Sequence, residues 1–585
     1  MPSSYLQEPP ALDNQYVADR VLRSYLSHRL PPEVREATTP SLRAMGDRAG
    51  GELYDLQQSD LRNEPTLTRW GPWGRRIDEI ESTDLWDRAE TIAATDGVVA
   101  AAYEQQYGRF SRIYQMALAY LFIPSTDMYG CPLAMTDGAA RTLLEKNGGA
   151  LADEVVPHLT SRTPDTFWTS GQWMTELAGG SDVGRARTVA RPDADGTWRL
   201  HGRKWFTSAI TANMALALAR PDGNPEGGAG LALFYVPIRT GDGLREGLYV
   251  NRLKDKLGTR KLPTAELRLD GAVAHPVTDR LRDGTRHIAP MLNITRTWNA
   301  VTAAALLRRG LALARDYAGK RTAFGKKLTE HPLHQETLAD IQAVLEGTVH
   351  LAFRPVELLG RVETGSADAS HKALLRLLTP IAKLTTAKRA VAQLSEVLEA
   401  FGGAGYVEDT GLPALLRDAQ VLPIWEGTTN VLALDLFRAL HETDGLAPLR
   451  SEAKRCLDAL SPALRDRVRP AQEALAAASR WWAQSAGRAS APQEAGARRF
   501  ALTLGGALEV LYTARHAQWA LDTRQDARSA AATERLAARR LNVLDPAPRR
   551  RTTVLAQDSS PLSPSRWRAE DGGTPPPDHP SPSRP

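Results

Sequence analysis

The spacing of apolar residues changes twice along this chain of 585 residues, and the change limits the folds open to it. Residues 1–165 have a mostly helical pattern, which is clearest in Arg109–Phe122. Residues 166–280 instead contain short apolar runs separated by Gly, Pro, Asp and Asn, as β-strands do. Examples are Ala215–Ala219, Leu231–Val236 and Glu266–Leu269. Helical spacing returns from about residue 283. We therefore predict an α+β chain in which a compact β domain separates two helical regions.

The second helical region is long and ends in a segment of different composition. His371–Phe401 predicts a long helix that stops at Gly402 and Gly403, and Pro380 either kinks it or divides it into two helices. Residues 441–545 predict further helices rich in Ala, Leu and Arg. The last forty residues contain ten prolines, so we expect residues 546–585 to be a disordered tail.

Composition narrows the possible environments and partners. No run of about 18 apolar residues occurs, so we expect no membrane span. Two distant cysteines, Cys131 and Cys456, do not support a disulfide framework or a cysteine-based zinc site, and we expect a reducing cytoplasm. Residues 441–585 hold 22 Lys and Arg against 16 Asp and Glu, a net charge of +6, which leaves −1 of the total +5 for residues 1–440. This asymmetry indicates either an anionic partner or arginines on solvated helix faces.

One short motif carries most of the chemical information. Ile424–Leu432 reads Ile-Trp-Glu-Gly-Thr-Thr-Asn-Val-Leu, and the Gly-Gly-x-Gly-Tyr run Gly402–Tyr406 precedes it. A single carboxylate, Glu426, follows an aromatic residue and precedes a glycine and two hydroxyl residues. Burial beside Ile424 and Trp425 would raise the pKa of this carboxyl and make it a stronger base.

Glu426 stands where the acyl-CoA dehydrogenases carry their catalytic base, and the chain resembles this family of flavoproteins over roughly residues 10–545. The resemblance implies FAD as cofactor and an acyl-CoA thioester as substrate. The base would remove the α-proton of the thioester while hydride leaves the β-carbon for flavin N5. The implied domains are an N-terminal helical domain (1–165), a middle β-barrel-like domain (166–280), a C-terminal helical bundle (281–440), an additional basic helical domain (441–545) and the tail (546–585).

Two motifs of the middle segment resemble flavin-binding sequences of the family. Met174–Val183 resembles the Thr-Glu-x-x-x-Gly-Ser-Asp loop, which assigns Thr175 and Ser181 to the cofactor. Lys204–Ser208 resembles the Lys-x-Trp-Ile-Thr-Asn strand. This second likeness assigns three more residues to the flavin ring: Trp205, Thr207 and Ser208. Read alone, an ordinary glycine-rich turn and a tryptophan of the domain core explain the same residues.

Motifs of the C-terminal bundle supply the remaining assignments. Arg321–Lys326 resembles Arg-x-x-Phe-Gly, in which the Arg contacts the cofactor pyrophosphate from the neighbouring subunit and the Phe packs beside the adenine. Arg296 matches an Arg beside the catalytic Glu, where a cation favours the ionised base, although a structural ion pair is the alternative. The cofactor residues implied here are Arg321, Phe324, Gly403, Thr428 and Asn430. Two glutamines of the family are replaced, by Pro332 and Glu399.

The N-terminal sequence indicates one branch of the family. Gln7–Tyr16 and Asn63–Leu67 resemble the adaptive-response, AidB-like branch. That likeness implies a homotetramer, a part in the alkylation-damage response, double-stranded DNA binding by the additional domain and weak dehydrogenase activity. An electron-transfer flavoprotein or oxygen is the candidate electron acceptor.

The additional domain offers a possible DNA contact. If residues 516–540 form one helix, a stripe of arginines lies within about a 60° arc and could neutralise phosphates. The stripe consists of Arg524, Arg528, Arg535 and Arg539. A solvated helix face is the alternative. Two functions therefore stay open, an FAD-dependent acyl-CoA dehydrogenase and a DNA-binding flavoprotein with little dehydrogenase activity.

Overall fold

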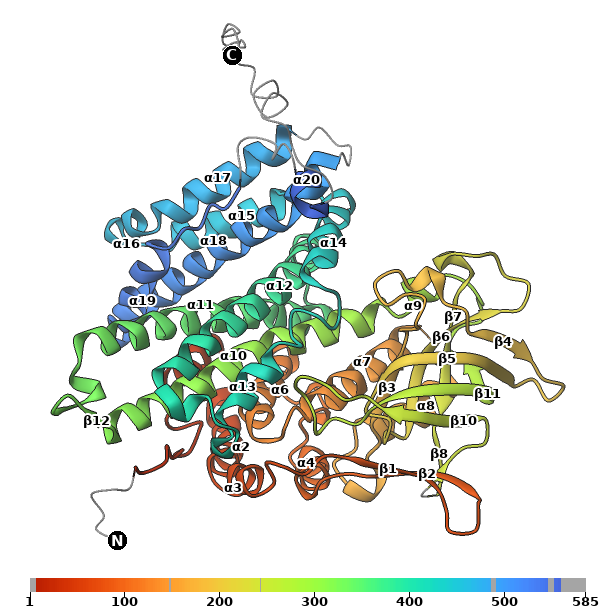
Figure 1. Cartoon of the computed structure of the whole chain (residues 1–585). Helices are drawn as coiled ribbons and strands as arrows, with labels where there is room; N and C mark the ends of the chain where they lie inside the picture. The colour runs from red at the N-terminus through yellow and green to blue at the C-terminus, as the bar shows by residue number, and fades with distance from the viewer. Residues whose placement is uncertain (1–6, 147–148, 242, 485–490, 545–551, 559–585) are drawn as a thin grey trace, which may run out of the picture.

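The computed structural model describes residues 7–146, 149–241, 243–484, 491–544 and 552–558. A β domain lies at one end of a larger helical body, and further helices pack along one side of that body, at the top in Figure 1. This arrangement confirms the predicted fold class. In the described part of the chain, no helix has the length and apolar character that crossing a membrane requires.

The N-terminal region consists of short helices around a shared apolar core. The side chains of Asp19 and Thr83 begin α1 and α4 by accepting hydrogen bonds from the backbone N–H groups of Leu22 and Trp86. The helices are α1 (Arg20–Arg29), α2 (Pro32–Gly50), α3 (Glu52–Ser59), α4 (Asp84–Thr95), α5 (Ala100–Tyr103), α6 (Ser111–Phe122), α7 (Gly130–Lys146) and α8 (Ala150–Leu159). An antiparallel hairpin of β1 (Thr66–Trp70) and β2 (Arg76–Glu81) interrupts them, which the helical prediction for this region missed.

The middle region is a seven-stranded sheet that curls on itself. Its strands are ordered β10-β11-β5-β4-β6-β3, and β7 pairs with both β11 and β6, so the sheet closes into a barrel-like shape. A separate core fills it, with Trp173, Leu200 and Phe234 fully buried. The bounds are β3 (Ser170–Trp173), β4 (Val189–Pro192), β5 (Trp198–Ser208), β6 (Met214–Pro221), β7 (Ala232–Pro237), β10 (Leu248–Leu253) and β11 (Thr264–Pro276), with a small pair β8 (Arg239–Thr240) and β9 (Gly243–Leu244) beside them.

Three long helices form the C-terminal bundle. They are α10 (Ala289–Lys320), α11 (Pro332–Glu363) and α12 (Ala369–Ala400), and they are accompanied by α9 (Gly284–His287), the hairpin β12 (Thr322–Ala323) and β13 (Lys326–Lys327), α13 (Leu412–Ala419) and α14 (Thr429–Glu442). Pro380 lies inside a single continuous α12, so of the two alternatives left open, a kink or a break, the division into two helices is excluded. Residues on both sides of Pro380 are buried, and packing against the neighbouring helices holds the helix together there.

Additional helices cover one side of this bundle, where α18 packs against α11, α12 and α14 (Figure 1). The helices are α15 (Ala447–Asp458), α16 (Pro462–Arg467), α17 (Arg469–Gln484), α18 (Ala491–Arg524), α19 (Arg528–Ala537) and α20 (Thr552–Gln557). The expected single helix over residues 516–540 is wrong. It is divided after Arg524, where Gln525 has a φ of +53°. The short α20 lies within the segment expected as a disordered tail, and residues 559–585 of that tail are outside the described residues.

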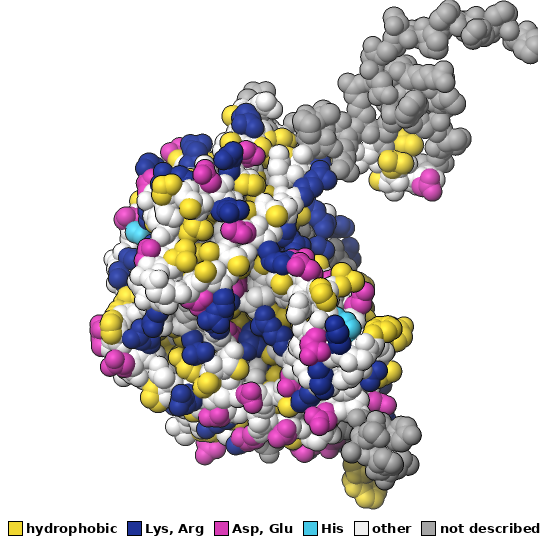
Figure 2. Space-filling model, turned by 90° about the vertical axis from the view of Figure 1, so that its left-hand side faces the viewer, with side chains coloured by type: hydrophobic (Ala, Val, Ile, Leu, Met, Phe, Trp, Pro, Cys, Tyr) yellow, Lys and Arg dark blue, Asp and Glu magenta, His cyan; other side chains and the backbone are white. Residues whose placement is uncertain are grey.

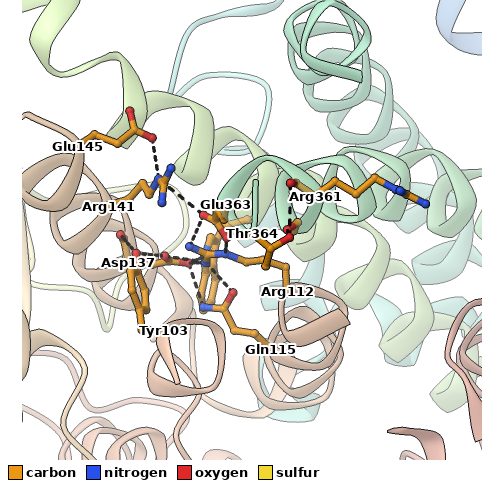
Figure 3. Close-up of polar contacts among 11 residues, drawn as sticks. Tyr103, Arg112, Gln115, Asp137, Arg141, Glu145, Arg361, Glu363 and Thr364 are labelled. Atoms are coloured by element: carbon orange, nitrogen blue, oxygen red, sulfur yellow. Dashed lines mark hydrogen bonds and ion pairs between the residues drawn. The ribbon is translucent and has the colours of Figure 1, made fainter. Parts of the chain in front are cut away.

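A buried ionic network joins the N-terminal region to the bundle. Asp137 of α7 accepts hydrogen bonds from Arg112 and Gln115 of α6 and from the indole N–H of Trp298 of α10, at 2.7, 2.9 and 2.8 Å. Arg112 lies between Asp137 and Glu363 at the end of α11, 2.6 Å from the latter (Figure 3). Separating these helices would leave buried charges without their partners, which is energetically costly. The network therefore fixes α10 against α6, α7 and α11.

Candidate active site

Glu426 lies in the loop between α13 and α14, on an unusual turn. Its φ is +57° and that of Gly427 is +101°, so two successive residues take left-handed conformations. Only glycine adopts these angles without strain, and Glu426 therefore requires support from its surroundings. The turn directs the carboxylate toward α10, where Thr295 Oγ1 donates a hydrogen bond to Oε2 at 2.6 Å.

The electrostatics of Glu426 suit a base. Burial raises the pKa of its carboxyl above the ordinary value, and this effect exceeds the opposing ones of the Thr295 hydrogen bond and the positive charges of Arg296 and Lys383. A carboxylate with a raised pKa accepts a proton more readily, and the nearby cations favour its ionised form and so limit that rise.

Two cations hold the backbone of the turn. Arg296 Nε donates to the carbonyl oxygen of Glu426 at 3.2 Å, and its NH1 pairs with Asp435 at 2.9 Å. Both sequence interpretations of Arg296 therefore apply, because it lies beside the base and also forms a structural ion pair. Lys383 Nζ donates to the carbonyl oxygen of Gly427 at 2.7 Å. Neither Lys383 nor Thr295 was identified from the sequence, although Thr295 directly precedes Arg296.

Two buried polar atoms lack partners, one on a side chain that interacts with Glu426 and one on the residue that precedes it in sequence. Among the described residues, Gln172 Oε1 on β3 and the indole Nε1 of Trp425 are buried and make no hydrogen bond. The Gln172 amide is also close enough to Glu426 to lower its pKa. A buried polar atom without a partner costs about 1–3 kcal/mol, so an acceptor and a donor left open here fit a site that a bound polar molecule completes. Ile424, expected to help bury the base, is 60% exposed, and that expectation is wrong.

The loop after β3 is fixed by a buried carboxylate. Glu176 accepts hydrogen bonds from the backbone N–H groups of Arg187 and Thr188, and Lys204 Nζ lies 2.8 Å from its Oε1. Gly179 is required inside this loop, because a Cβ there would lie 2.4 Å from the carbonyl oxygen of Asp182. Sequence reasoning identified the loop and its glycines but not the Glu176–Lys204 pair. The signal that the sequence offered was a Glu in the loop and a Lys on the neighbouring strand, two opposite charges that can pair when both are buried.

The predicted flavin residues of the middle domain lie on that loop and on β5. The backbone carbonyl oxygen of Thr175 accepts a hydrogen bond from the backbone N–H of Trp205 at 2.9 Å, which ties the loop to the strand, and Ser181 is exposed. Trp205 is half-buried with Lys254 Nζ 3.3 Å from its ring centre. The Thr207 hydroxyl donates to the Ala265 carbonyl at 2.8 Å, so its proton is already used within the sheet. The hydroxyl of Ser208 shares a 3.2 Å contact with that of Thr264.

A second group of predicted cofactor residues lies at the other end of the bundle. Arg321 follows the last residue of α10, a helix of 32 residues and therefore about 48 Å long. Figure 1 shows the β12–β13 hairpin at the end of the bundle remote from the β domain. Phe324 in this hairpin is 98% exposed, and a Cβ at Gly403 would meet no atom within 4 Å. Within one chain, Arg321 and Phe324 cannot reach a flavin held by Trp205.

The last two predicted cofactor residues lie at the start of α14. Thr428 caps the helix by accepting the N–H of Val431 at 3.4 Å. Asn430 is exposed, and its side-chain oxygen accepts a hydrogen bond from Arg498 of α18 at 3.4 Å. The additional helical region thus contacts the segment directly after the candidate base.

The four arginines of the expected stripe do not form one. Arg535 is paired with Glu336 and Asp340 of α11, each at 2.8 Å. Arg528 is paired with Asp526, Arg539 is half-buried, and Arg524 lies over the ring of Trp519. The face that carries α16, α19 and the β12–β13 hairpin shows Lys and Arg side chains interspersed with Asp and Glu (Figure 2). The break between α18 and α19 and these ion pairs contradict the single arginine stripe.

Family models match most of the chain. The acyl-CoA dehydrogenase C-terminal domain matches residues 282–441, the acyl-CoA dehydrogenase middle domain matches residues 171–272, and the adaptive response protein AidB N-terminal domain matches residues 7–166. The chain belongs to the acyl-CoA dehydrogenase family. Its N-terminal domain is of the AidB type, which confirms the branch that the sequence indicated.

Individual relatives agree. The chain is 45% identical over 451 residues to acyl-CoA dehydrogenase family member 11 of Caenorhabditis elegans, covering 76% of this chain and 73% of that protein. It is 33% identical to the AidB protein of Escherichia coli, covering 70% of this chain and 76% of that protein. The structure of C. elegans ACDH-11 in complex with C11-CoA superposes with a TM-score of 0.89 at 39% identity, over 93% of this chain and 94% of that chain.

The cofactor of the family is FAD. A Bacillus anthracis acyl-CoA dehydrogenase complexed with FAD shares the fold, with a TM-score of 0.69 at 18% identity over 91% of this chain and 90% of that chain. The unpartnered donor and acceptor beside Glu426 and the half-buried Trp205 fit a polar, planar molecule of this kind.

Proposed function

We propose that this chain is an FAD-dependent acyl-CoA dehydrogenase in which Glu426 removes the α-proton of an acyl-CoA thioester. FAD, when bound, supplies the acceptor for the hydride that leaves the β-carbon. The observation that carries the proposal is the carboxylate of Glu426, held by Thr295 at 2.6 Å beside two polar atoms without partners. The raised pKa of the Glu426 carboxyl supports the same role.

The chain's own residues divide this work. The turn at Glu426 and Gly427 orients the base, and Thr295 holds one carboxylate oxygen so that the other faces the substrate. Trp425 and Gln172 line the site with a donor and an acceptor, which would position polar groups of the substrate or cofactor. Trp205 and the loop of Thr175 and Ser181 would hold the flavin ring from the β domain.

We also propose that the cofactor site is completed by a second copy of the chain in a homotetramer. Arg321 and Phe324 lie beyond the far end of α10, too far to reach a flavin bound at Trp205 of the same chain. The exposed Phe324 ring and the exposed Arg321, whose NH1 donates to Gln7 Oε1 at 3.3 Å, are available to a neighbouring subunit, as are Gly403 and its open surroundings. Removing Arg321 should then reduce flavin content, and sedimentation of the flavin-loaded protein should give four subunits.

The relative crystallised with C11-CoA favours a medium-length acyl chain as substrate of this protein. An anaerobic titration of the flavin-loaded protein with short, branched and medium acyl-CoAs tests the proposal. Loss of the flavin absorbance with one of these thioesters is expected. A stable flavin spectrum with every thioester would contradict dehydrogenase activity.

Duplex DNA binding and an alkylation response stay predictions of the AidB-like resemblance, as do the cytoplasmic location and an electron-transfer flavoprotein as acceptor. Four arginines were predicted to contact DNA. Among the described residues, Arg524 is the one of these four that is exposed and forms no ion pair. Salt-dependent duplex binding by the full chain tests the DNA function. Binding that does not weaken with salt would be inconsistent with contacts to phosphates.

A further inference from the structure

Lys383 is a buried cation close to the base. It lies in the middle of α12 with its ammonium group fully buried, and Nζ donates to the Gly427 carbonyl oxygen at 2.7 Å. It forms no salt bridge among the described residues, and the negative charge that acts on it is that of Glu426. Because a buried ammonium without a paired carboxylate is costly, its position calls for a function.

Lys383 and Arg296 hold adjacent carbonyl groups from two different helices. Arg296 of α10 donates to the carbonyl of Glu426, and Lys383 of α12 donates to that of Gly427. Arg296 is paired with Asp435 at 2.9 Å, a carboxylate that also pairs with Arg376, whereas Lys383 has no paired carboxylate among the described residues. Both positive charges lower the pKa of Glu426, and the ammonium of Lys383 is the one held without a carboxylate partner of its own among the described residues.

We propose that Lys383 is a positioning residue for Glu426, which fixes the left-handed turn through the Gly427 carbonyl and favours the ionised carboxylate by its charge. The inference rests on the proposed role of Glu426 as the base. It assigns a function to a residue that lies outside every cofactor and base motif of the sequence.

The proposal has a pH signature. Burial lowers the pKa of Lys383 to about 7, so the ammonium is present below that pH and is lost as the pH rises through it. Glu426 must be ionised, which limits the reaction on the acidic side. The rate of flavin reduction should therefore fall on both sides of an optimum. The other charged groups on the packed elements are Arg296 of α10, Arg376 of α12, Asp435 and Arg438 of α14, and the Arg389–Glu509 pair between α12 and α18.

The experiment measures flavin reduction by saturating acyl-CoA, anaerobically and across pH, in three variants. Lys383→Met removes the donor and the charge, Lys383→Arg keeps both without titrating, and Lys388→Met makes the same change five residues later on α12 as a control. We expect Lys383→Met to reduce the saturating rate roughly 10- to 100-fold, the size of a lost hydrogen bond from a charged donor. The acyl-CoA concentration for half-saturation and the flavin content should stay unchanged.

The shape of the profile separates positioning from general structural support. The basic limb should disappear in Lys383→Met and in Lys383→Arg, the latter should recover most of the rate, and Lys388→Met should behave as the parent. The proposal would be overturned if both Lys383 variants kept a basic limb at about the same pH as in the parent protein. If Lys383→Met loses flavin or folds poorly, the presence or absence of the basic limb in Lys383→Arg alone tests the proposal. A parent whose flavin no thioester reduces would contradict the proposed function itself, which is a different result.

Discussion

The hydroxyl of Thr295 lies 2.6 Å from Oε2 of Glu426, and this contact links α10 of the bundle to the loop that carries the candidate base. Trp298, one turn further along α10, is bonded to the buried Asp137 at 2.8 Å. The position of Thr295 is therefore fixed by an ionic network that joins four helices. The orientation of Glu426 depends on the packing of the whole helical body rather than on its own loop.

Replacing Thr295 by Val should shift the pH dependence of flavin reduction. The Thr295 hydrogen bond lowers the pKa of Glu426, so its loss raises that pKa and moves the acidic limb to higher pH. We expect about a 10-fold slower reduction on the acidic side, the size of a hydrogen bond to a charged group. Thr295→Ser, which keeps the hydroxyl, serves as the control. If the acidic limb of the pH profile is the same in Thr295→Val as in the parent, Thr295 does not affect the pKa of Glu426.

Replacing Lys204 by Met should destabilise the chain and weaken flavin binding. The change leaves the Glu176 carboxylate buried without its cation, which costs about 3–5 kcal/mol in comparable buried pairs. Glu176 also holds the loop of Thr175 and Ser181, so flavin content should fall. Denaturant unfolding and flavin stoichiometry measure the two effects. The double variant Lys204→Met, Glu176→Gln should recover part of the stability, and a variant no better than Lys204→Met would argue against an unpaired charge as the cause.

Acid should destabilise the junction between α1, α11 and α18. His28, His350 and His516 lie together there, with the His28 and His516 rings 3.2 Å apart at their Nδ1 atoms. Burial is the largest cause that lowers the pKa of His28 to about 2 and that of His516 to about 3, and it lowers the pKa of His350 well below its ordinary value. The charged groups acting on them are Arg20, Arg29, Arg515, Glu357 and Asp526.

The direction in which stability changes with pH follows from proton uptake by the unfolded chain. The unfolded chain binds protons at these histidines below about pH 6.5, while the folded chain does not, so stability is present above that pH and falls as the pH drops. Each histidine contributes a slope of up to about 1.4 kcal/mol per pH unit. Urea unfolding at several pH values should show this fall, and His516→Gln should flatten it. The same pH dependence in the parent and in His516→Gln would exclude His516 as a contributor.

Arg535→Gln should leave any affinity for duplex DNA within about twofold of the parent, since its guanidinium is held by Glu336 and Asp340 and is not free for phosphates. Arg524→Gln is the matched comparison, and in a DNA-binding chain it should reduce the salt dependence by about one phosphate contact. A large loss of affinity in Arg535→Gln alone would restore the arginine-stripe interpretation.

Much of the fold could be predicted because hydrophobic spacing and glycine signals are local. The strand runs of the β domain and the end of α12 before Gly402 follow from such patterns. The sequence left open whether Pro380 kinks or divides the helix, because that depends on the burial on both sides, which outweighs the missing hydrogen bond. The division between α18 and α19 was missed because Gln525, rather than glycine or proline, takes the left-handed conformation there.

The residues of the candidate site also fall into those that sequence motifs predict and those that only the tertiary structure brings together. Glu426 and Arg296 belong to contiguous motifs that a sequence displays. Lys383 lies 43 residues before Glu426 on an apolar helix, and only the packing of α12 against the loop brings it to the Gly427 carbonyl. The pairing of Arg535 with α11 likewise depends on tertiary structure, so a helical projection placed it on a stripe open to DNA phosphates or to solvent.

The role of Glu426 as base is the central claim, and rapid anaerobic mixing of the flavin-loaded protein with acyl-CoA tests it most directly. Glu426→Gln is nearly isosteric and should retain flavin and bind the thioester, while losing proton abstraction. General-base catalysis contributes about 10²- to 10⁴-fold, so flavin reduction should slow by at least that range. A Glu426→Gln variant that reduces its flavin as fast as the parent would contradict the account.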